Sequence, residues 1–275
     1  MALLQVDPEK CQRDGICVAE CPVGIIELGP ADAVPREVPA AERLCLRCGH
    51  CVAVCPQGAM SIAGMRSEAC PPIRRELVPS GEQVEQLLRS RRSIRSYLDR
   101  EIEHGAVERL IDLARYAPTG TNSQQVHWLV VASRAEVQRL AGMAIDWMRH
   151  LVKIGDPAAS RLPMPRIISA WESGADVICR GAPGLVITHV PQEYPVGPID
   201  CAIALTFLDL AAPSFGFGTC WAGLFMFAIQ GWPPLREALA VPPGRTPRAA
   251  MMIGYPRFRY HRLPLRKTPV ITWQG

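Results

Sequence analysis

The chain has 275 residues, of which 48% are hydrophobic and 20% are charged, and its formal net charge is +4. This composition is typical of a folded soluble protein and excludes a largely disordered one. Residues 1–64 carry eight acidic and five basic side chains, so the basic excess lies in the remainder of the chain. We expect an anionic cofactor, rather than a nucleic-acid partner, to account for this excess.

The eleven cysteines are the strongest signal in the composition, because seven of them lie in residues 11–55. The first ten residues lack the apolar segment of a signal peptide, so we expect a cytoplasmic protein with reduced, metal-bound cysteines. The cysteines belong to an internal repeat. CQRDGICVAECPVGII, which starts at Cys11, aligns with CLRCGHCVAVCPQGAM, which starts at Cys45. The copies differ at one ligand-type position, where the first has Asp14 and the second has Cys48.

The second copy has the spacing C-x2-C-x2-C-x3-C-P. This run is typical of bacterial ferredoxins, in which three cysteines of one run bind one cluster and the fourth binds the neighbouring cluster. A zinc site is disfavoured, because zinc ribbons use two separated C-x2-C pairs. We therefore expect one [4Fe–4S] cluster, called cluster II, to be bound by Cys21, Cys45, Cys48 and Cys51.

The first copy has the spacing C-x2-D-x2-C-x3-C-P. We expect a second cluster, called cluster I, to be bound by Cys11, Cys17 and Cys55, with Asp14 or no protein ligand at the fourth iron position. A carboxylate is a harder ligand than a thiolate, so this iron would be more labile. The sequence is compatible with a [4Fe–4S] cluster that has an aspartate ligand or with a [3Fe–4S] cluster. The alternative for Asp14 is a solvated turn residue next to Gly15.

Five further residues of metal-binding type are expected to have other roles. His50 lies between two predicted ligands, and we expect it to shape hydrogen bonding to a sulfur atom. The other cysteines are dispersed, and each is expected to be a small buried residue or an incidental one. They are Cys70, Cys179, Cys201 and Cys220.

Between and after the two copies, the sequence predicts loops and then helices. Residues 29–40 (GPADAVPREVPA) are predicted to be a loop, and residues 65–79 are rich in proline and charge, as in a linker. Ser80 begins a capping-box pattern, SGEQ, which predicts the start of a helix. Apolar residues at helical spacing from Val107 predict a second helix that ends before Pro118.

The remainder of the chain alternates strand-like and helical runs, which indicates an α+β or α/β domain of about two hundred residues. Strands are predicted at 128–132, 185–190 and 249–253. Helices are predicted near 134–150, 166–180 and 199–212. The apolar stretch 199–232 is interrupted by Asp200, Asp209 and Pro213, so we expect a buried helix and a buried strand rather than a membrane span.

Four segments resemble, in the same order, segments of the FMN-dependent nitroreductase family. They are RRSIRSY from Arg91, APTGTNSQQVHWLVV from Ala117, the apolar run from Asp200 to Phe225, and IGYPRFRYHRLPLRK from Ile253. With its cysteine-rich beginning, the chain resembles the ferredoxin-fused branch of that family. The fold class that this implies is α+β, with a two-cluster ferredoxin-like domain at 1–64, a linker at 65–79 and a nitroreductase-like FMN-binding domain at 80–275.

The resemblance implies an FMN site at the matching positions. The residues expected at the phosphate are Arg91, Arg92, Ser93, Arg95, Arg266 and Lys267. The loop residues expected at the flavin are Pro118, Thr119, Gly120, Asn122 and Gln124, of which the family takes Thr119, Gly120 and Asn122 from the partner subunit. The segment expected to pass over the ring contains Cys220, Trp221, Ala222 and Gly223. Gln125 stands where the family usually has proline.

The residue types agree with this assignment. Arginines and a serine after a helix suit a dianionic phosphate, although a solvated basic helix end would have the same composition. A polar loop after Pro118 suits a heterocycle edge and ribityl hydroxyls, and a plain polar loop is the alternative. Neither a G-x-G-x-x-G nor a G-x4-G-K-[ST] motif occurs, so there is no sequence evidence for a dinucleotide site.

We therefore expect an oxidoreductase. An external donor such as a ferredoxin would deliver electrons through two iron–sulfur clusters to FMN, which would reduce an electron-poor acceptor such as a nitroaromatic or a quinone. The alternatives are a non-enzymatic electron-transfer or redox-sensing protein and a specialised flavin reaction such as reductive dehalogenation. We also expect a homodimer and no membrane partner, and the sequence identifies no catalytic residue.

Overall fold

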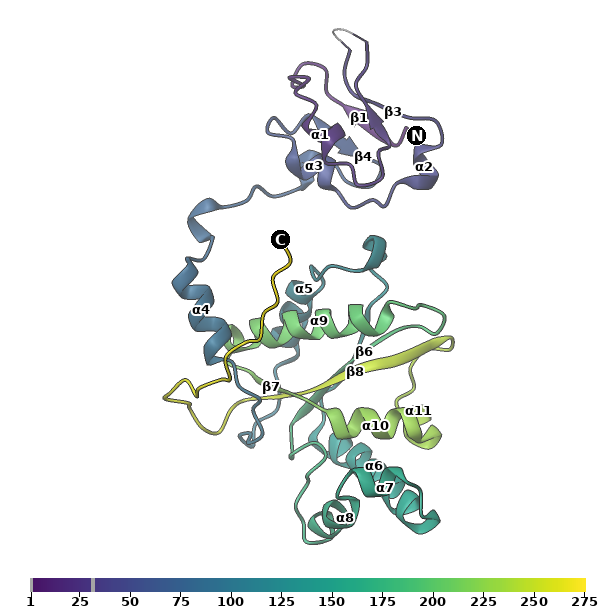
Figure 1. Cartoon of the computed structure of the whole chain (residues 1–275), viewed down its shortest axis with the longest axis vertical. Helices are drawn as coiled ribbons and strands as arrows, with labels where there is room; N and C mark the ends of the chain where they lie inside the picture. Colours follow the sequence, from purple (N-terminus) through teal and green to yellow (C-terminus); the bar gives the residue numbers. More distant parts are fainter. Residues whose placement is uncertain (1, 31–32) are drawn as a thin grey trace. The chain divides into compact units, whose positions relative to one another are not determined.

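The computed structural model describes residues 2–30 and 33–275, and it forms two compact units (Figure 1). The first unit comprises Met1–Val78 together with Thr121–Ser123. The second comprises Pro79–Gly120 and Gln124–Gly275. Asp32, one of the acidic residues counted above, and part of the loop predicted at 29–40 lie outside the described residues.

The internal repeat folds as two similar halves in the first unit. Its elements are β1 (Leu4–Val6), α1 (Ile16–Ala19), β2 (Ile26–Glu27), β3 (Arg36–Glu37), α2 (Ala41–Leu44), α3 (His50–Val54) and β4 (Met60–Ile62). Strands β1 and β4 form one antiparallel pair, and β2 and β3 form the other. Helices α1 and α3, which occupy equivalent positions in the two copies, each follow a left-handed glycine, with φ of 73° at Gly15 and 74° at Gly49.

Strand β3 lies inside the segment predicted to be a loop, so that prediction was wrong for these two residues. The strand pairs with β2, and the Arg36 Nε donates to Glu27 Oε1 at 2.8 Å. Two residues are too few to show a hydrophobic period, and the pairing depends on a partner strand nine residues away.

The core of the first unit is small. Among the described residues, its hydrophobic cluster contains eight buried side chains: Leu3, Cys17, Ile25, Ile26, Ala41, Val52, Met60 and Ile62. A domain of this size with strands of two or three residues seldom supplies enough stability from apolar burial alone. We therefore expect its stability to depend on cross-links such as bound metal clusters.

The chain then continues through two exposed 3-10 turns, η1 (Ser67–Ala69) and η2 (Arg75–Leu77), into α4 (Gly81–Ser90). The capping box predicted at the start of α4 is confirmed. The Ser80 hydroxyl accepts from the Gln83 backbone N–H at 3.2 Å, and the Gln83 side chain accepts from the Ser80 N–H at 2.8 Å. Of the two alternatives for Cys70, a buried residue or an incidental one, its exposure in this segment favours the second.

The second unit is built on an antiparallel sheet in the order β5-β6-β8-β7. Its strands are β5 (His127–Val131), β6 (Gly184–Pro191), β7 (Gly218–Trp221) and β8 (Arg245–Gly254). Its helices are α5 (His104–Ala114), α6 (Arg134–Ile154), α7 (Ala158–Arg161), α8 (Met164–Glu172), α9 (Gly197–Ala211), α10 (Gly223–Gly231) and α11 (Pro233–Ala238), with 3-10 turns η3 (Gly120–Asn122) and η4 (Ala212–Phe215). The α+β fold class is confirmed.

Helices cover both faces of this sheet, so most residues of the central strands β6 and β8 are buried. Leu185 and Ile187 of β6 pack with α6, α8, α10 and α11, whereas Val186 and Val190 pack with α5 and α9. This double burial explains why the predicted strands are continuous apolar runs rather than alternating ones.

The apolar stretch 199–232 contains α9 followed by the largely buried strand β7, so the buried helix and the buried strand expected there are confirmed. The sequence did not predict α10, with which the stretch ends. The predicted helix at 166–180 is also too long, since α8 ends at Glu172. After it, the Asp176 carboxylate accepts from the backbone N–H groups of Ile178, Cys179 and Gly181 and stabilises a turn.

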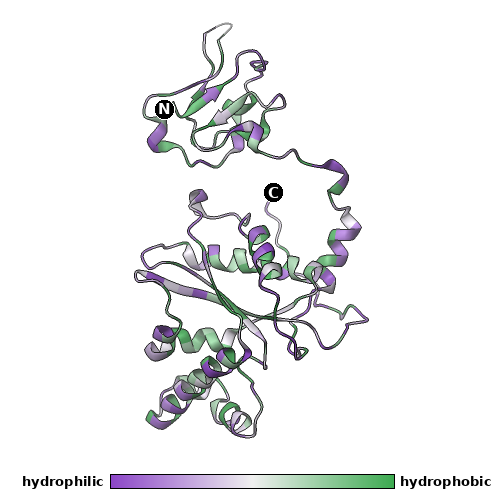
Figure 2. Ribbon diagram, turned by 180° about the vertical axis from the view of Figure 1, so that it is seen from behind, coloured by the Kyte–Doolittle hydropathy of each residue, from purple (hydrophilic) through white to green (hydrophobic). Residues whose placement is uncertain are grey.

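Among the described residues, one helical segment, 197–215, is long and apolar enough to cross a membrane by length and composition. Figure 2 shows the hydrophobic colour over much of α9 and α10. Core helices of soluble proteins meet the same criterion, and α9 packs on β6 and β8. Its two aspartates, Asp200 and Asp209, are 3% and 5% exposed and are hydrogen-bonded within the unit.

Candidate functional site

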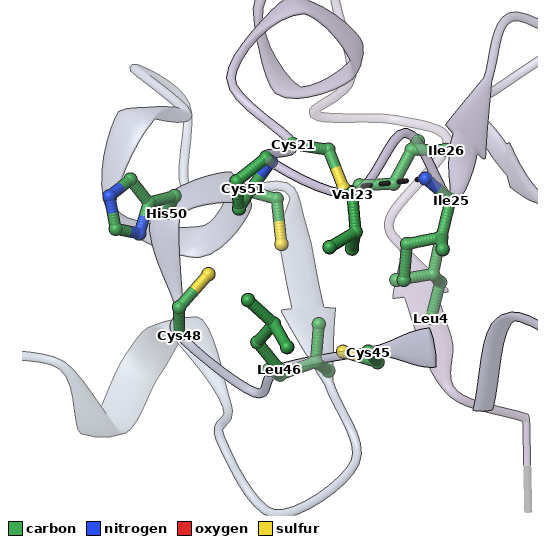
Figure 3. Close-up of a pocket in the computed structure, with 13 residues that line it drawn as sticks. Leu4, Cys21, Val23, Ile25, Ile26, Cys45, Leu46, Cys48, His50 and Cys51 are labelled. Carbon is green, nitrogen blue, oxygen red and sulfur yellow. Dashed lines mark hydrogen bonds between the residues drawn. The ribbon is translucent and has the colours of Figure 1, made fainter. Parts of the chain in front are cut away.

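The first unit contains two cavities ringed by residues of metal-binding type. One of them, of about 340 Å³, is lined by apolar side chains and by four cysteines that come from both copies of the repeat (Figure 3). These cysteines are Cys21, Cys45, Cys48 and Cys51, the set predicted to bind cluster II. His50 stands at the edge of this cavity with its ring exposed, in agreement with a role outside the ligand set.

The other cavity, of about 350 Å³, is lined by Cys11, Asp14, Cys17 and Cys55, the set predicted for cluster I. Each copy therefore sends its fourth cysteine to the cavity of the other copy. The local cause is visible at Cys55, which follows α3 directly with an extended backbone at φ −71° and ψ 112°. The chain leaves the helix at this residue, so Cys55 no longer shares the helix face of Cys51.

Backbone N–H groups point at three of the sulfur atoms. The Ile25 N–H donates to Cys21 Sγ at 3.4 Å, and the Ala59 N–H donates to Cys55 Sγ at 3.3 Å. These two bonds occupy equivalent positions in the two copies. The Arg47 N–H also donates to Cys45 Sγ at 3.4 Å. Such donors stabilise negative charge on sulfur and tune the potential of a bound cluster.

Burial disfavours the charged thiolate form of Cys51 and Cys17. Burial raises the pKa of Cys51 to about 11, and the neighbouring cysteines add to this shift while a backbone hydrogen bond opposes it. Burial, followed by the Asp14 carboxylate, also raises the pKa of Cys17. A bound iron ion would compensate the thiolate charge at these two positions.

Asp14 has a local structural role as well as its place in the cavity lining. Its side chain is exposed, and its Oδ1 accepts from the Ile16 N–H at 3.1 Å at the start of α1. This is the turn role weighed against ligation in the sequence. Both roles use the same carboxylate, and they do not exclude each other.

In the second unit, a broad cavity of about 1480 Å³ gathers basic residues. Arg91 and Arg92 line it as they leave α4, and Arg257 and Arg259 line it after β8. Among the described residues, its lining does not include Ser93 or Arg95, whose side chains were also predicted at the phosphate. Arg95 Nη1 instead donates to the Ser93 carbonyl at 3.5 Å.

Sequence reasoning missed Arg257 and Arg259, and the structure does not bring Arg266 and Lys267 to this cavity. The latter two lie in the exposed segment that follows β8. All four residues belong to the segment that starts at Ile253 and resembles the family. The position of Arg257 and Arg259 shortly after a predicted strand is a signal that could have identified them. Four guanidinium groups around one cavity can bind a phosphate dianion by charge-assisted hydrogen bonds.

A buried carboxylate, Asp209, orients one of these arginines. Its Oδ2 lies 3.5 Å from Arg91 Nη1, and its Oδ1 accepts from the Thr219 hydroxyl. Asp209 belongs to α9 and Thr219 to β7, so two elements fix the position of Arg91. Sequence reasoning treated Asp209 only as an interruption of an apolar stretch.

The predicted flavin loop lines a cavity and is held by hydrogen bonds within the loop and to α9. Thr119 and Gln124 line a separate cavity of about 720 Å³ with Trp128 and Ala204. The Gln124 N–H donates to the Thr119 hydroxyl at 3.0 Å. The Gly120 N–H donates to the carboxylate of Asp200 at 3.1 Å.

The middle of this loop, Thr121–Ser123, belongs to the first unit. There the side-chain amide of Asn122 donates to the carbonyl oxygens of Leu46 at 3.0 Å and Arg47 at 3.2 Å.

The segment predicted to pass over the flavin ring is the junction of β7 and α10. Cys220 is buried, as expected, whereas Trp221 is 40% exposed at the end of the strand. Ala222 is the N-cap of α10, and its N–H donates to the Ala250 carbonyl of the neighbouring strand at 2.9 Å. The first-turn amides of α10, beginning at the exposed Gly223, have no acceptor within the helix.

Two family models match the chain. One, described as the nitroreductase family, matches residues 88–255, and the other, described as a 4Fe-4S dicluster domain, matches residues 9–60. An FMN reductase [NAD(P)H] of Bacillus subtilis is 28% identical over 180 residues, which are 64% of this chain and 67% of that protein. A 4-nitrobenzoate reductase of Nocardioides sp. is 26% identical over 225 residues, which are 70% of this chain and 88% of that protein.

Solved structures share the fold of the second unit. A nitroreductase with bound FMN from Bacteroides fragilis has a TM-score of 0.56 and 22% identity, over 70% of this chain and 99% of that one. A nitroreductase with bound FMN from Desulfitobacterium hafniense has a TM-score of 0.55 and 19% identity, over 70% of this chain and 97% of that one.

Proposed function

Because the chain belongs to the nitroreductase family and carries a 4Fe-4S dicluster domain, we propose that this oxidoreductase passes electrons from an external one-electron donor through two clusters to FMN and on to an electron-poor acceptor. The observation that carries the proposal is the placement of eight ligand-type side chains around two cavities in the chain that also contains the flavin-type domain.

The cluster part of the proposal rests on the donor sets. Four thiols around one cavity suit a [4Fe–4S] cluster, and three thiols with a carboxylate suit either a [4Fe–4S] cluster with an aspartate ligand or a [3Fe–4S] cluster. Backbone donors to Cys21, Cys45 and Cys55 are already in place to stabilise the sulfur charge.

The flavin part of the proposal rests on three sets of residues in the second unit. The arginine-lined cavity suits the phosphate, the loop with Thr119 and Gln124 suits a heterocycle edge, and the exposed amides at Gly223 suit a ring carbonyl. FMN supplies the step from single electrons to reduction of an organic molecule, because it accepts both one and two electrons.

We also propose that the flavin site is completed in a homodimer. The arginine-lined and loop cavities share no lining residue within one chain, so one FMN would take its phosphate contacts from one subunit and its loop contacts from the other. Large apolar side chains on α9 and α10 are exposed, with Ile199 at 62%, Phe207 at 41% and Phe227 at 51%, and they suit a subunit interface. Light scattering of the flavin-loaded protein should give twice the chain mass, and a monomer with tightly bound FMN would contradict the dimer.

The acceptor class is a proposal from the relatives, one of which is named a 4-nitrobenzoate reductase. We propose nitroaromatics, quinones or similar conjugated acceptors. Anaerobic flavin reoxidation with each class tests this directly, and reoxidation by none of them would contradict it.

The electron-entry route is tested by stopped-flow flavin absorbance under anaerobic conditions. Reduced ferredoxin should reduce the FMN much faster than NADH or NADPH does. The Cys48→Ala variant should lose most of that reduction but retain flavin reoxidation by an acceptor. Cys70→Ala is the matched control, because Cys70 is exposed and lines neither cavity. Fast reduction by NADH or NADPH in the Cys48→Ala variant would show that the clusters are not the entry route.

A further inference from the structure

The loop at 117–125 has a strained backbone. Three of its residues other than glycine have positive φ, with 51° at Thr121, 54° at Asn122 and 51° at Gln124. Asparagine tolerates this region, but for β-branched threonine it is a clear outlier. Such conformations persist only where surrounding contacts over-determine them, and they concentrate at binding and catalytic sites.

One end of the loop is fixed by a buried carboxylate of α9. Asp200 accepts from the Gly120 N–H at 3.1 Å through Oδ1 and at 3.2 Å through Oδ2, and it accepts from the Tyr194 hydroxyl at 2.7 Å. A Cβ at Gly120 would lie 2.7 Å from Val196 Cγ2, so the backbone is seated closely on the segment before α9. Burial of a carboxylate destabilises a protein unless hydrogen-bond donors satisfy it. The donors to Asp200 are the Gly120 N–H of the loop and the Tyr194 hydroxyl.

The other end of the loop is fixed by Arg245, at the start of β8. Its Nη2 donates to the Gln125 carbonyl at 2.5 Å and to the His189 carbonyl at 3.1 Å. Its Nε donates to His189 Nδ1 at 2.8 Å, which requires that nitrogen to be unprotonated. Burial, followed by Arg245 and His127, lowers the pKa of His189 to about 4, so this contact is intact at neutral pH.

The two anchored residues, Gly120 and Gln125, each directly follow a residue that lines the loop cavity. Those residues are Thr119 and Gln124, and the bond from the Gln124 N–H to the Thr119 hydroxyl links the two ends of the loop. We propose that Asp200 and Arg245 are positioning residues, which hold the loop at Gly120 and Gln125 in the conformation that binds FMN. This inference rests on the flavin site proposed above.

Four variants of the full chain test the inference. Asp200→Ala removes the acceptor of the Gly120 N–H. Asp200→Asn retains an acceptor of similar shape, and the Tyr194 hydroxyl can turn to the Gly120 carbonyl, which lies 3.3 Å away. Arg245→Met keeps the length of the side chain but removes its donors. Asp112→Asn is the matched control, because Asp112 is an exposed carboxylate of α5 whose partner is Arg115.

Three measurements are made on each variant. They are the FMN dissociation constant by flavin fluorescence, the melting temperature of the flavin-free protein, and backbone amide exchange of residues 117–125 in the flavin-free protein. We expect Asp200→Ala and Arg245→Met to raise the dissociation constant tenfold or more and to accelerate exchange in the loop. Asp200→Asn should remain within about threefold of the unaltered protein, and Asp112→Asn should match it.

Retention of FMN affinity in Asp200→Asn, but not in Asp200→Ala, separates positioning of the loop from general stability. Asparagine removes the charge of Asp200 but keeps its shape and one hydrogen bond. If Asp200→Ala does not fold, Tyr194→Phe replaces it, since it removes only the hydroxyl that donates to Asp200. Tyr194→Phe should raise the dissociation constant severalfold. Unchanged FMN affinity in the variants, or a loss of affinity that only follows the melting temperature, would overturn the inference. Failure of the unaltered protein to bind FMN would instead overturn the proposed function.

Discussion

The two halves of the first unit share features of backbone geometry but differ at one of the residues predicted to bind a cluster. Both halves place a left-handed residue two positions before the helix-initiating glycine, with φ of 57° at Arg13 and 50° at Arg47. Both donate a backbone N–H to the cysteine that crosses to the other cavity. They differ at Asp14, which is exposed, and Cys48, which is half-buried.

This difference shows that the backbone geometry of the site does not require cysteine at the second ligand position. In the first half, the bond from the Ile16 N–H to the Asp14 carboxylate holds the turn. Because this bond holds the turn, the residue type at position 14 can differ from that at position 48 without a change of fold. We infer that the two clusters have different iron lability and different potentials, because ligand type and exposure both tune them.

The largest effect that the comparison predicts is the loss of a single cluster from either half. Cys51→Ala should empty the cavity of Cys21, Cys45 and Cys48, and Cys17→Ala should empty the other. Each variant should lose about half of the bound iron, because each cavity has its own ligand set. Iron analysis and electron paramagnetic resonance of the anaerobically purified proteins measure this. Loss of all iron from both variants would mean that the halves do not bind their clusters independently.

An exchange of the differing ligand is expected to have a smaller effect. Asp14→Cys should make cluster I resemble cluster II and should slow the loss of iron to a chelator by about tenfold, because thiolate is the softer ligand. Cys48→Asp should have the opposite effect on cluster II. If Asp14→Cys leaves the iron content and the paramagnetic spectrum unchanged, Asp14 is not at the metal and has only the turn role.

The sequence predicted the features that depend on local spacing and missed those that depend on distant contacts. The placement of Cys21 and Cys55 in opposite cavities follows from short runs in which each ligand is fixed by its neighbours in the chain. The short strand β3 was missed because its pairing with β2 leaves no periodic pattern in two residues.

The same limit applies to the second unit. Asp200 interrupts an apolar helix in the sequence, and its partner Gly120 lies 80 positions earlier. Arg257 and Arg259 were missed because five lysine and arginine residues follow β8 in one segment, and only the folded chain shows which pair lines the arginine cavity. A polar residue inside an apolar run was nevertheless a usable signal, because such a residue needs a partner.

The smallest predicted difference concerns the two helix-initiating glycines. Both have the same left-handed φ, so alanine at either position should cost about 1 kcal/mol of unfolding free energy. Their surroundings differ. A Cβ at Gly15 would meet the Leu28 methyl groups at an ordinary 3.8 Å, whereas a Cβ at Gly49 would lie 2.7 Å from Met65 Sδ. Gly49→Ala should therefore be more destabilising than Gly15→Ala by roughly another 1 kcal/mol, the cost of displacing a packed side chain.

Denaturation followed by the visible absorbance of the clusters measures this difference, because the absorbance is lost when the first unit unfolds. Met65→Ala in the Gly49→Ala background is the control. It removes the clash but not the strained backbone, so the coupling between the two substitutions should recover most of the extra cost. Equal destabilisation by Gly15→Ala and Gly49→Ala would mean that the halves tolerate the turn equally. The ligand at position 14 would then be the only energetic difference between them at this turn.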